Sequence, residues 1–137
     1  GIGFYATPNY IERHGMPGSM DDLEADKHTV IGFDRHRPQL EALAGLDLGR
    51  EITRDIFDFR TDNDIAQVSA VRAGLGIGAV QHALARRSNL TPVLANAFHF
   101  ELEIWVAMHE NLKGSKRMRL MFDHLVEGLA RFVAEGR

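Results

Sequence analysis

A stretch near the C-terminal end of the sequence, residues 115–134, has the strongest pattern in the chain. Its apolar side chains recur at the i, i+3, i+4 and i+7 positions of a helix with one wide apolar face. They are Met118, Met121, Phe122, Leu125, Leu129, Phe132 and Val133. Burying one such side chain stabilises a protein by about 1.5–3 kcal/mol, so this face requires a covering layer. We expect that layer to come from the rest of this chain, from a second copy, or from a segment outside this sequence.

Short β-rich runs alternate with helix signals along the rest of the chain. Extended segments are predicted at residues 4–6, 28–33, 55–60, 76–80, 90–94 and 102–108. Helices are predicted at residues 8–14, after Ser19, at residues 39–46, from Thr61 to about Gly74, and at residues 81–87. This alternation favours an α/β fold in which the strands pair at least partly in parallel.

Two of the helix starts have recognisable capping residues. Thr7 is a good N-cap in front of Pro8, and Gly15 can end that helix. Thr61 is predicted to cap the helix that follows, with Asp64 at the capping-box position. A helix start also presents free N–H groups and a positive dipole end, so the one at Thr61 can either be simply capped or hold a ligand carboxylate.

Composition excludes several classes of function. The chain has no cysteine, which rules out disulfides, thiolate metal sites and cysteine nucleophiles. Its net charge is −3 and its basic residues are scattered, so it lacks the footprint of a nucleic-acid-binding surface. No apolar run approaches the ~20 residues that span a bilayer. The sequence starts without an initiator Met or a signal peptide, as expected for a segment of a longer protein.

The remaining motifs favour structural roles over catalytic ones. Gly74, Gly76 and Gly78 follow a predicted helix and precede a strand, the reverse of a phosphate-binding loop, so we interpret them as a helix end and a tight turn. The seven histidines include no metal-binding spacing, and His28 and His36 are interpreted as exposed. No serine lies in a nucleophile-elbow motif. We therefore predict no enzyme activity, no metal and no cofactor.

Three ordered motifs resemble LysR-type transcriptional regulators. The first comprises ATPNYI at residues 6–11, RHGMP at 13–17 and Asp22-Leu23. The second is RTDN at 60–63 followed by AVRAGLGIG at 70–78, and the third is MRLMFDHLV at 118–126. Together they cover nearly the whole chain, which makes the resemblance more specific than any one motif.

The resemblance implies the fold of that family's effector-binding domain, which is similar to type 2 periplasmic binding proteins. Two α/β lobes are joined there by two crossover strands, with the ligand in the cleft between the lobes. In this sequence residues 1–7 and 90–97 would be the crossovers, residues 8–89 the second lobe, and residues 98–137 the C-terminal part of the first lobe. The residues implied to contact effector are Thr7, with Ala6 at the cleft floor, Gly32, Phe33, Asp34, Thr61, Asp62 and Asn63.

The resemblance also implies the protein's function and partners. A small-molecule effector, such as an organic acid, would bind in the cleft of a cytoplasmic homo-oligomeric regulator. DNA would be contacted only through an N-terminal winged helix-turn-helix absent from this sequence, and no membrane would be involved. Two alternatives stay open, a periplasmic solute-binding protein of a transporter and an enzyme on a related α/β scaffold.

Overall fold

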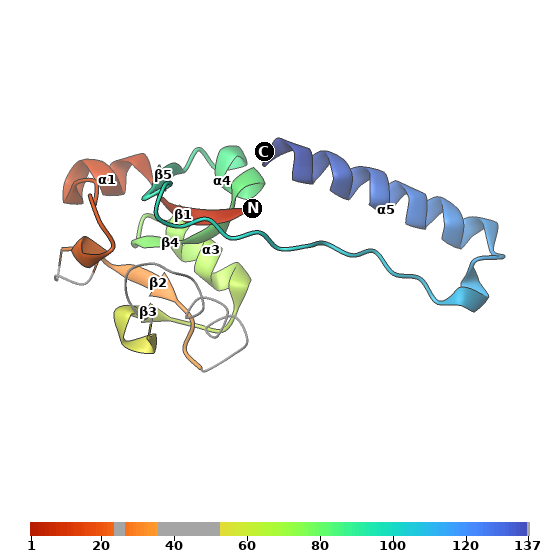
Figure 1. Cartoon of the computed structure of the whole chain (residues 1–137), viewed down its shortest axis with the longest axis horizontal. Coiled ribbons are helices and arrows are strands. Elements are labelled where there is room, and N and C mark those ends of the chain that lie inside the picture. The colour runs from red at the N-terminus through yellow and green to blue at the C-terminus, as the bar shows by residue number, and fades with distance from the viewer. Residues whose placement is uncertain (24–26, 36–52, 137) are drawn as a thin grey trace.

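The chain forms a mixed five-stranded sheet with helices packed around it (Figure 1). A computed structural model describes residues 1–23, 27–35 and 53–136. The strands are β1 (Ile2–Ala6), β2 (Val30–Gly32), β3 (Phe59–Arg60), β4 (Ile77–Gln81) and β5 (Thr91–Val93), in the order β3-β2-β4-β1-β5. β2 pairs in parallel with β3 and β4, whereas β1 is antiparallel to β4 and β5. The predicted α/β class with partly parallel pairing is confirmed.

The helices are α1 (Pro8–His14), α3 (Asp64–Arg72), α4 (His82–Arg87) and α5 (Lys116–Glu135), with 3₁₀ turns η1 (Asp21–Leu23), η2 (Arg54–Ile56) and η3 (Glu110–Leu112). α1 begins as predicted: the Thr7 hydroxyl accepts a hydrogen bond from the Tyr10 N–H at 3.2 Å, and Pro8 is the first helical residue. It ends at Gly15, whose φ of 83° suits a residue without a Cβ. The helix predicted at residues 39–46 lies outside the described residues.

Alternate residues of the strands point to opposite faces and build two apolar clusters. On one face Phe4 and Val30 pack with Tyr10 of α1, with Ile56 and Phe57, and with Phe98. The cluster on the other face consists of Tyr5, Ile31, Val71, Val80, Ala85 and Leu90, so α3 and α4 cover that side. This period-two alternation explains why so short a sheet is buried on both sides.

The glycines between α3 and β4 are structural, as interpreted from the sequence. Gly74 has a φ of 75° just after the end of α3. A Cβ on Gly76 would lie 2.2 Å from the carbonyl oxygen of Thr29, so only glycine lets the two backbones approach here. These glycines bring the start of β4 against the start of β2.

Three predicted elements differ in part from the structure. α3 is capped by Asn63 and not by Thr61, since the Asn63 side chain accepts from the Ala66 N–H at 3.0 Å. The strand predicted at residues 55–60 is a 3₁₀ turn followed by the two residues of β3. Before η1 the Asp22 carboxylate accepts from the N–H groups of Gly18 and Ser19, which replaces the expected Ser19 cap.

The strand predicted at residues 102–108 is wrong. In the structure this segment runs away from the sheet without regular secondary structure, and Trp105 is 82% exposed. Its last link to the sheet is a bridge between Ile2 and Phe100. Within the described part of the chain, residues 101–108 have no backbone hydrogen-bond partner. A β-favouring sequence becomes a strand only where a neighbouring strand supplies those bonds.

α5 forms as predicted but extends away from the sheet beside the preceding segment (Figure 1). Residues 101–136 are called the arm below. The last turn of α5 is tied to α4, where the Arg87 guanidinium donates to both carboxylate oxygens of Glu135 at 2.8 and 2.9 Å. Its exposed apolar residues include Leu120, Met121, Leu125 and Val126. The described rest of the chain therefore does not cover this face.

Candidate functional site

Six of the seven predicted effector contacts gather at one edge of the sheet. β2 and β3 are parallel, so their carboxyl ends at Gly32 and Arg60 lie side by side. The Thr61 N–H donates to the Gly32 carbonyl at 3.0 Å, which joins the two loops that follow. The Asp62 carboxylate accepts from the N–H groups of Asp34 and Arg35, both at 3.2 Å. Loops at the carboxyl ends of parallel strands are where open α/β sheets bind ligands.

The start of α3 is held in place by its own polar side chains. The Thr61 hydroxyl accepts from the Asn63 N–H at 3.2 Å, and the Gln67 amide donates to the Thr61 carbonyl at 2.7 Å. Among the described residues, the N–H groups of Asp64 and Ile65 have no acceptor. Free first-turn donors of this kind can hold a carboxylate.

Two of the six residues act mainly through packing. A Cβ on Gly32 would lie 2.3 Å from the Phe57 ring, so this glycine allows the ring to pack on β2. Phe33 is partly buried against the same apolar cluster. Asp34 remains available at the surface and pairs with the Arg54 guanidinium at 3.1 Å. Arg54 is a neighbour that the sequence did not indicate, because it reaches the site from η2.

Thr7 does not join this group. β1 runs antiparallel to β4 while β2 runs parallel to it, so β1 ends at the opposite edge of the sheet. There the Thr7 hydroxyl caps α1, close to Gly74. The structure thus separates Ala6 and Thr7 from the other six predicted contacts. The sequence pattern located β1 but did not reveal its direction relative to its neighbours.

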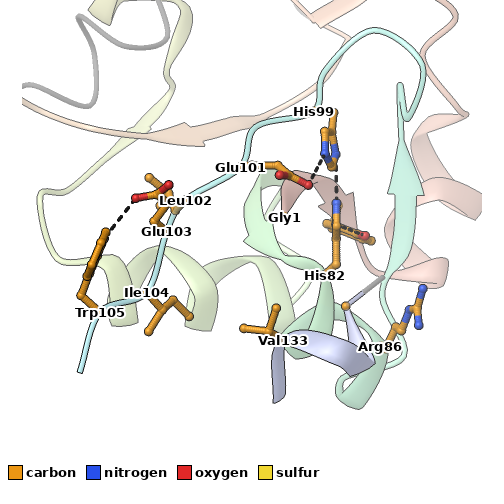
Figure 2. Close-up of a pocket in the computed structure, with 12 residues that line it drawn as sticks. Gly1, His82, Arg86, His99, Glu101, Leu102, Glu103, Ile104, Trp105 and Val133 are labelled. Carbon is orange, nitrogen blue, oxygen red and sulfur yellow. Dashed lines mark hydrogen bonds and ion pairs between the residues drawn. The ribbon is translucent and has the colours of Figure 1, made fainter. Parts of the chain in front are cut away.

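A pocket of about 730 Å³ lies at the carboxyl end of β4, the same edge as the predicted contacts (Figure 2). It is lined by residues from the start of the chain, from α4, from the segment after β5 and from the last turn of α5. Tyr5, His82 and His99 form its polar wall, and Ile104 and Trp105 contribute apolar side chains.

The polar wall is a chain of hydrogen-bonding groups. The Tyr5 hydroxyl lies 2.7 Å from His82 Nδ1, and His82 Nε2 lies 3.2 Å from His99 Nδ1. His99 Nε2 is in turn 3.5 Å from the Glu101 carboxylate. Burial lowers the pKa of His82 and raises the pKa of the Tyr5 hydroxyl. The sequence did not indicate this group, because its members are far apart in the chain.

Another histidine, His28, lies at the opposite edge of the sheet. His28 is 8% exposed, which corrects the interpretation that it lies at the surface, and His36 lies outside the described residues. Burial lowers the pKa of His28, and its Nδ1 atom has no hydrogen-bond partner. Its ring faces Tyr10, which stacks on His14. His28 therefore belongs to the packing beneath α1.

Within residues 1–23, 27–35 and 53–136, no three acidic or histidine side chains gather in a way that suits a metal ion. The helices of these ranges are all too short or too polar to span a bilayer.

Comparison with known proteins identifies the fold. No protein-family model and no curated protein matches the sequence. The regulatory domain of CrgA, a LysR-type transcriptional regulator from Neisseria meningitidis, matches with a TM-score of 0.70 and 23% identity over 93% of this chain and 64% of that one. The fold is that of a LysR-type regulatory domain. The resemblance predicted from the three motifs is therefore confirmed at the level of the fold.

Two further structures agree with this result. A second CrgA structure matches with a TM-score of 0.64 and 22% identity, covering 93% of this chain and 44% of that one. The regulatory domain of AphB in Vibrio vulnificus gives a TM-score of 0.50 and 22% identity over 68% and 48% of the two chains. The present chain thus spans less than two thirds of the LysR-type regulatory domains that it resembles.

Proposed function

We propose that this chain is part of the effector-sensing domain of a bacterial LysR-type transcriptional regulator. The observation that carries the proposal is the LysR-type regulatory fold over 93% of the chain, together with three motifs in the family's order. The three matching structures described above are regulators, which favours this reading over a periplasmic solute-binding protein. We propose no catalytic role.

The domain would have two lobes. The sheet with residues 8–89 would be the second lobe, and β1 and β5, which pair side by side, would belong to the crossovers at residues 1–7 and 90–97. Residues 98–137 would belong to the first lobe. The unpaired segment at residues 102–108 and the apolar face of α5 support this division, because both need strands that the described chain lacks.

The effector would bind where the loops after β2 and β3 meet the start of α3. Asp34, Thr61, Asp62 and Asn63 line this edge, and the free N–H groups of Asp64 and Ile65 would donate hydrogen bonds to the carboxylate of an organic acid. The pairing of Asp62 with two N–H groups compensates part of its charge. Gly32 and Phe33 would shape the site from below.

The regulator would act by coupling effector binding to the arrangement of its lobes and subunits. It would be a cytoplasmic homo-oligomer that contacts DNA through an N-terminal winged helix-turn-helix. An effector that binds one arrangement more tightly shifts the population toward it, and such couplings typically amount to about 1–3 kcal/mol.

Variants at Asn63 test the binding site in the full regulator. A panel of small carboxylic acids would first be screened by thermal shift, and hits measured by calorimetry. Asn63→Ala removes both the cap and a ligand contact, whereas Asn63→Asp keeps the cap and adds a repelling charge. We expect both variants to bind the acid more weakly. Unchanged affinity in Asn63→Asp would exclude this edge as the carboxylate site.

A further inference from the structure

The pocket wall formed by Tyr5, His82, His99 and Glu101 connects three parts of the chain. Tyr5 belongs to β1, His82 is the first residue of α4, and the other two lie on the segment that leaves the sheet after β5. Figure 2 shows His82, His99 and Glu101 joined one after another, with Arg86 pointing away from the two rings. The contact between the two histidines thus joins the sheet to the segment that leads directly into the arm.

The distances allow one consistent arrangement of protons when both histidines are neutral. The Tyr5 hydroxyl donates to His82 Nδ1 at 2.7 Å, and the Nε2–H of His82 donates to His99 Nδ1 at 3.2 Å. The Nε2–H of His99 then faces the Glu101 carboxylate at 3.5 Å. Each neutral imidazole has one donor and one acceptor nitrogen, so every group in the chain is matched.

A first proton can be accommodated by reversing the direction of these bonds. A charged His99 would donate from Nδ1 to His82 Nε2, and His82 Nδ1 would donate to the Tyr5 oxygen. Glu101 would still face the charged ring. A second proton cannot be accommodated, because both nitrogens of a charged imidazole are donors and two N–H groups would then oppose each other at 3.2 Å.

The charged groups around His82 oppose its protonation. His99 and Arg86 lower the pKa of His82, in addition to the larger effect of burial, and Glu101 raises it. On α5, the Glu135 carboxylate is paired with Arg87, and its carbonyl accepts from Arg86. Glu103 also lines the pocket.

Few other contacts hold residues 98–100, the segment just before the arm, against the sheet. Phe98 is buried and stacks on Phe4 with ring centroids 4.1 Å apart, and the Ile2–Phe100 bridge has hydrogen bonds of 2.7 and 3.0 Å. Beyond Phe100 the backbone of residues 101–108 has no partner among the described residues. The His82–His99 contact lies beside that bridge, so its loss would weaken the bridge most directly.

We propose that His82 and His99 form a proton-operated latch, which holds residues 99–105 against the sheet at neutral pH and releases them when the pair takes up a second proton. Release would open the pocket, because Leu102, Ile104 and Trp105 form its opposite wall. The latch does not depend on effector binding at α3. In a regulator with two lobes it would make the arrangement of the lobes sensitive to acid.

The direction of the pH effect follows from linkage. A histidine whose pKa is lowered in the folded protein binds fewer protons there than in the released state. The latch is therefore fully closed above the ordinary histidine pKa of about 6.5, and it weakens as the pH falls from there through the lower value in the folded protein.

Two nuclear magnetic resonance measurements on this chain test the proposal. Long-range ¹H–¹⁵N spectra at neutral pH report the tautomers, and we expect Nε2–H for both histidines. Amide exchange of Ile2 and Phe100, corrected for the intrinsic pH dependence, reports the latch. Between about pH 7.5 and about pH 5.5 we expect the protection of both amides to fall, because the pair takes up its second proton more readily in the released state.

Matched histidine variants identify the cause of this loss. His99→Gln removes the second imidazole and should weaken the pH dependence of the Phe100 protection, because only the burial of His82 and the charge of Arg86 then oppose protonation. His124→Gln, on α5 and outside the cluster, should behave like the unmodified chain. Equal pH dependence in His99→Gln and the unmodified chain would overturn the proposal. So would an Nδ1–H tautomer on either ring at neutral pH, a result that needs no variant.

Discussion

The sheet and the arm contain equally strand-like sequences but differ in structure. Residues 77–81 form β4 between two neighbouring strands, whereas residues 102–105 are exposed and belong to no strand. The difference lies outside the segments themselves: β4 has backbone hydrogen-bond partners on both sides, and residues 101–108 have none in the described chain. Local sequence sets what a segment prefers, and a neighbouring strand decides whether that preference is realised.

Matched isoleucine truncations should show the largest difference between the two regions. Ile77 is 0% exposed in β4, and Ile104 is 46% exposed in the arm. We expect Ile77→Ala to lower the free energy of unfolding by about 2–5 kcal/mol through lost burial and a cavity. Ile104→Ala should change it by less than about 0.5 kcal/mol. Urea unfolding of this chain measures both, and a large cost at Ile104 would mean that the arm is covered in solution.

Matched glycine substitutions sharpen the comparison. A Cβ on Gly32 would meet the Phe57 ring at 2.3 Å, whereas one on Gly128 in α5 meets nothing within 4 Å. Gly32→Ala should destabilise the sheet by about 1–3 kcal/mol through overpacking. Gly128→Ala should stabilise α5 by up to about 1 kcal/mol through its helix propensity. The opposite signs should appear in thermal unfolding followed by circular dichroism, and a stabilising Gly32→Ala would contradict the packing described here.

Capping residues offer a smaller test of the same comparison. Asn63 accepts a hydrogen bond from the Ala66 N–H at the start of α3, but Ser115 makes no side-chain cap bond at the start of α5. Asn63→Ala should cost about 1 kcal/mol, whereas Asn63→Ser should retain most of the stability. Ser115→Ala should have almost no effect. Denaturant unfolding of the three variants measures these changes in the free energy of unfolding. An equal loss of stability in Ser115→Ala and Asn63→Ala would refute the assigned caps.

The ion pair that ties α5 to α4 should have the smallest effect. Arg87 and Glu135 are about half exposed, so their bidentate contact is worth only about 0.2–1 kcal/mol. Glu135→Gln should weaken it, and the loss should shrink as salt is added because exposed charges are screened. Denaturant unfolding at low and high ionic strength measures this dependence. A loss that salt leaves unchanged would mean that packing and not charge holds the end of α5.

Much of the local structure could be predicted because it depends on short-range chemistry. Thr7, Pro8 and Gly15 delimit α1 through capping and backbone preference, and the apolar period of residues 115–134 matches α5. Gly74 and Gly76 were interpreted correctly from their order between a helix and a strand. The start of α3 was placed two residues early, because Thr61 and Asn63 are both good caps. In the structure the Thr61 N–H bonds to the Gly32 carbonyl and Asn63 caps the helix.

The candidate site was only partly predictable. Gly32 to Asp34 and Thr61 to Asn63 were grouped correctly, since parallel strands bring their carboxyl ends together. The separation of Thr7 from this group was not predictable, because the direction of β1 follows from its pairing with β4. Arg54 and the His82–His99 contact were not indicated, because no periodicity relates residues brought together by separate loops.

The amino-acid sequence by itself determined which segments are helical, where most helices begin and end, and which faces must be apolar. These features depend on side chains within a few residues of one another. Only the tertiary structure decided the strand order, the separation of Thr7 from the other predicted contacts, the meeting of His82 with His99, and the unpaired state of residues 102–108. Each of these depends on hydrogen-bond partners far away in the chain, which exist only once the sheet has assembled.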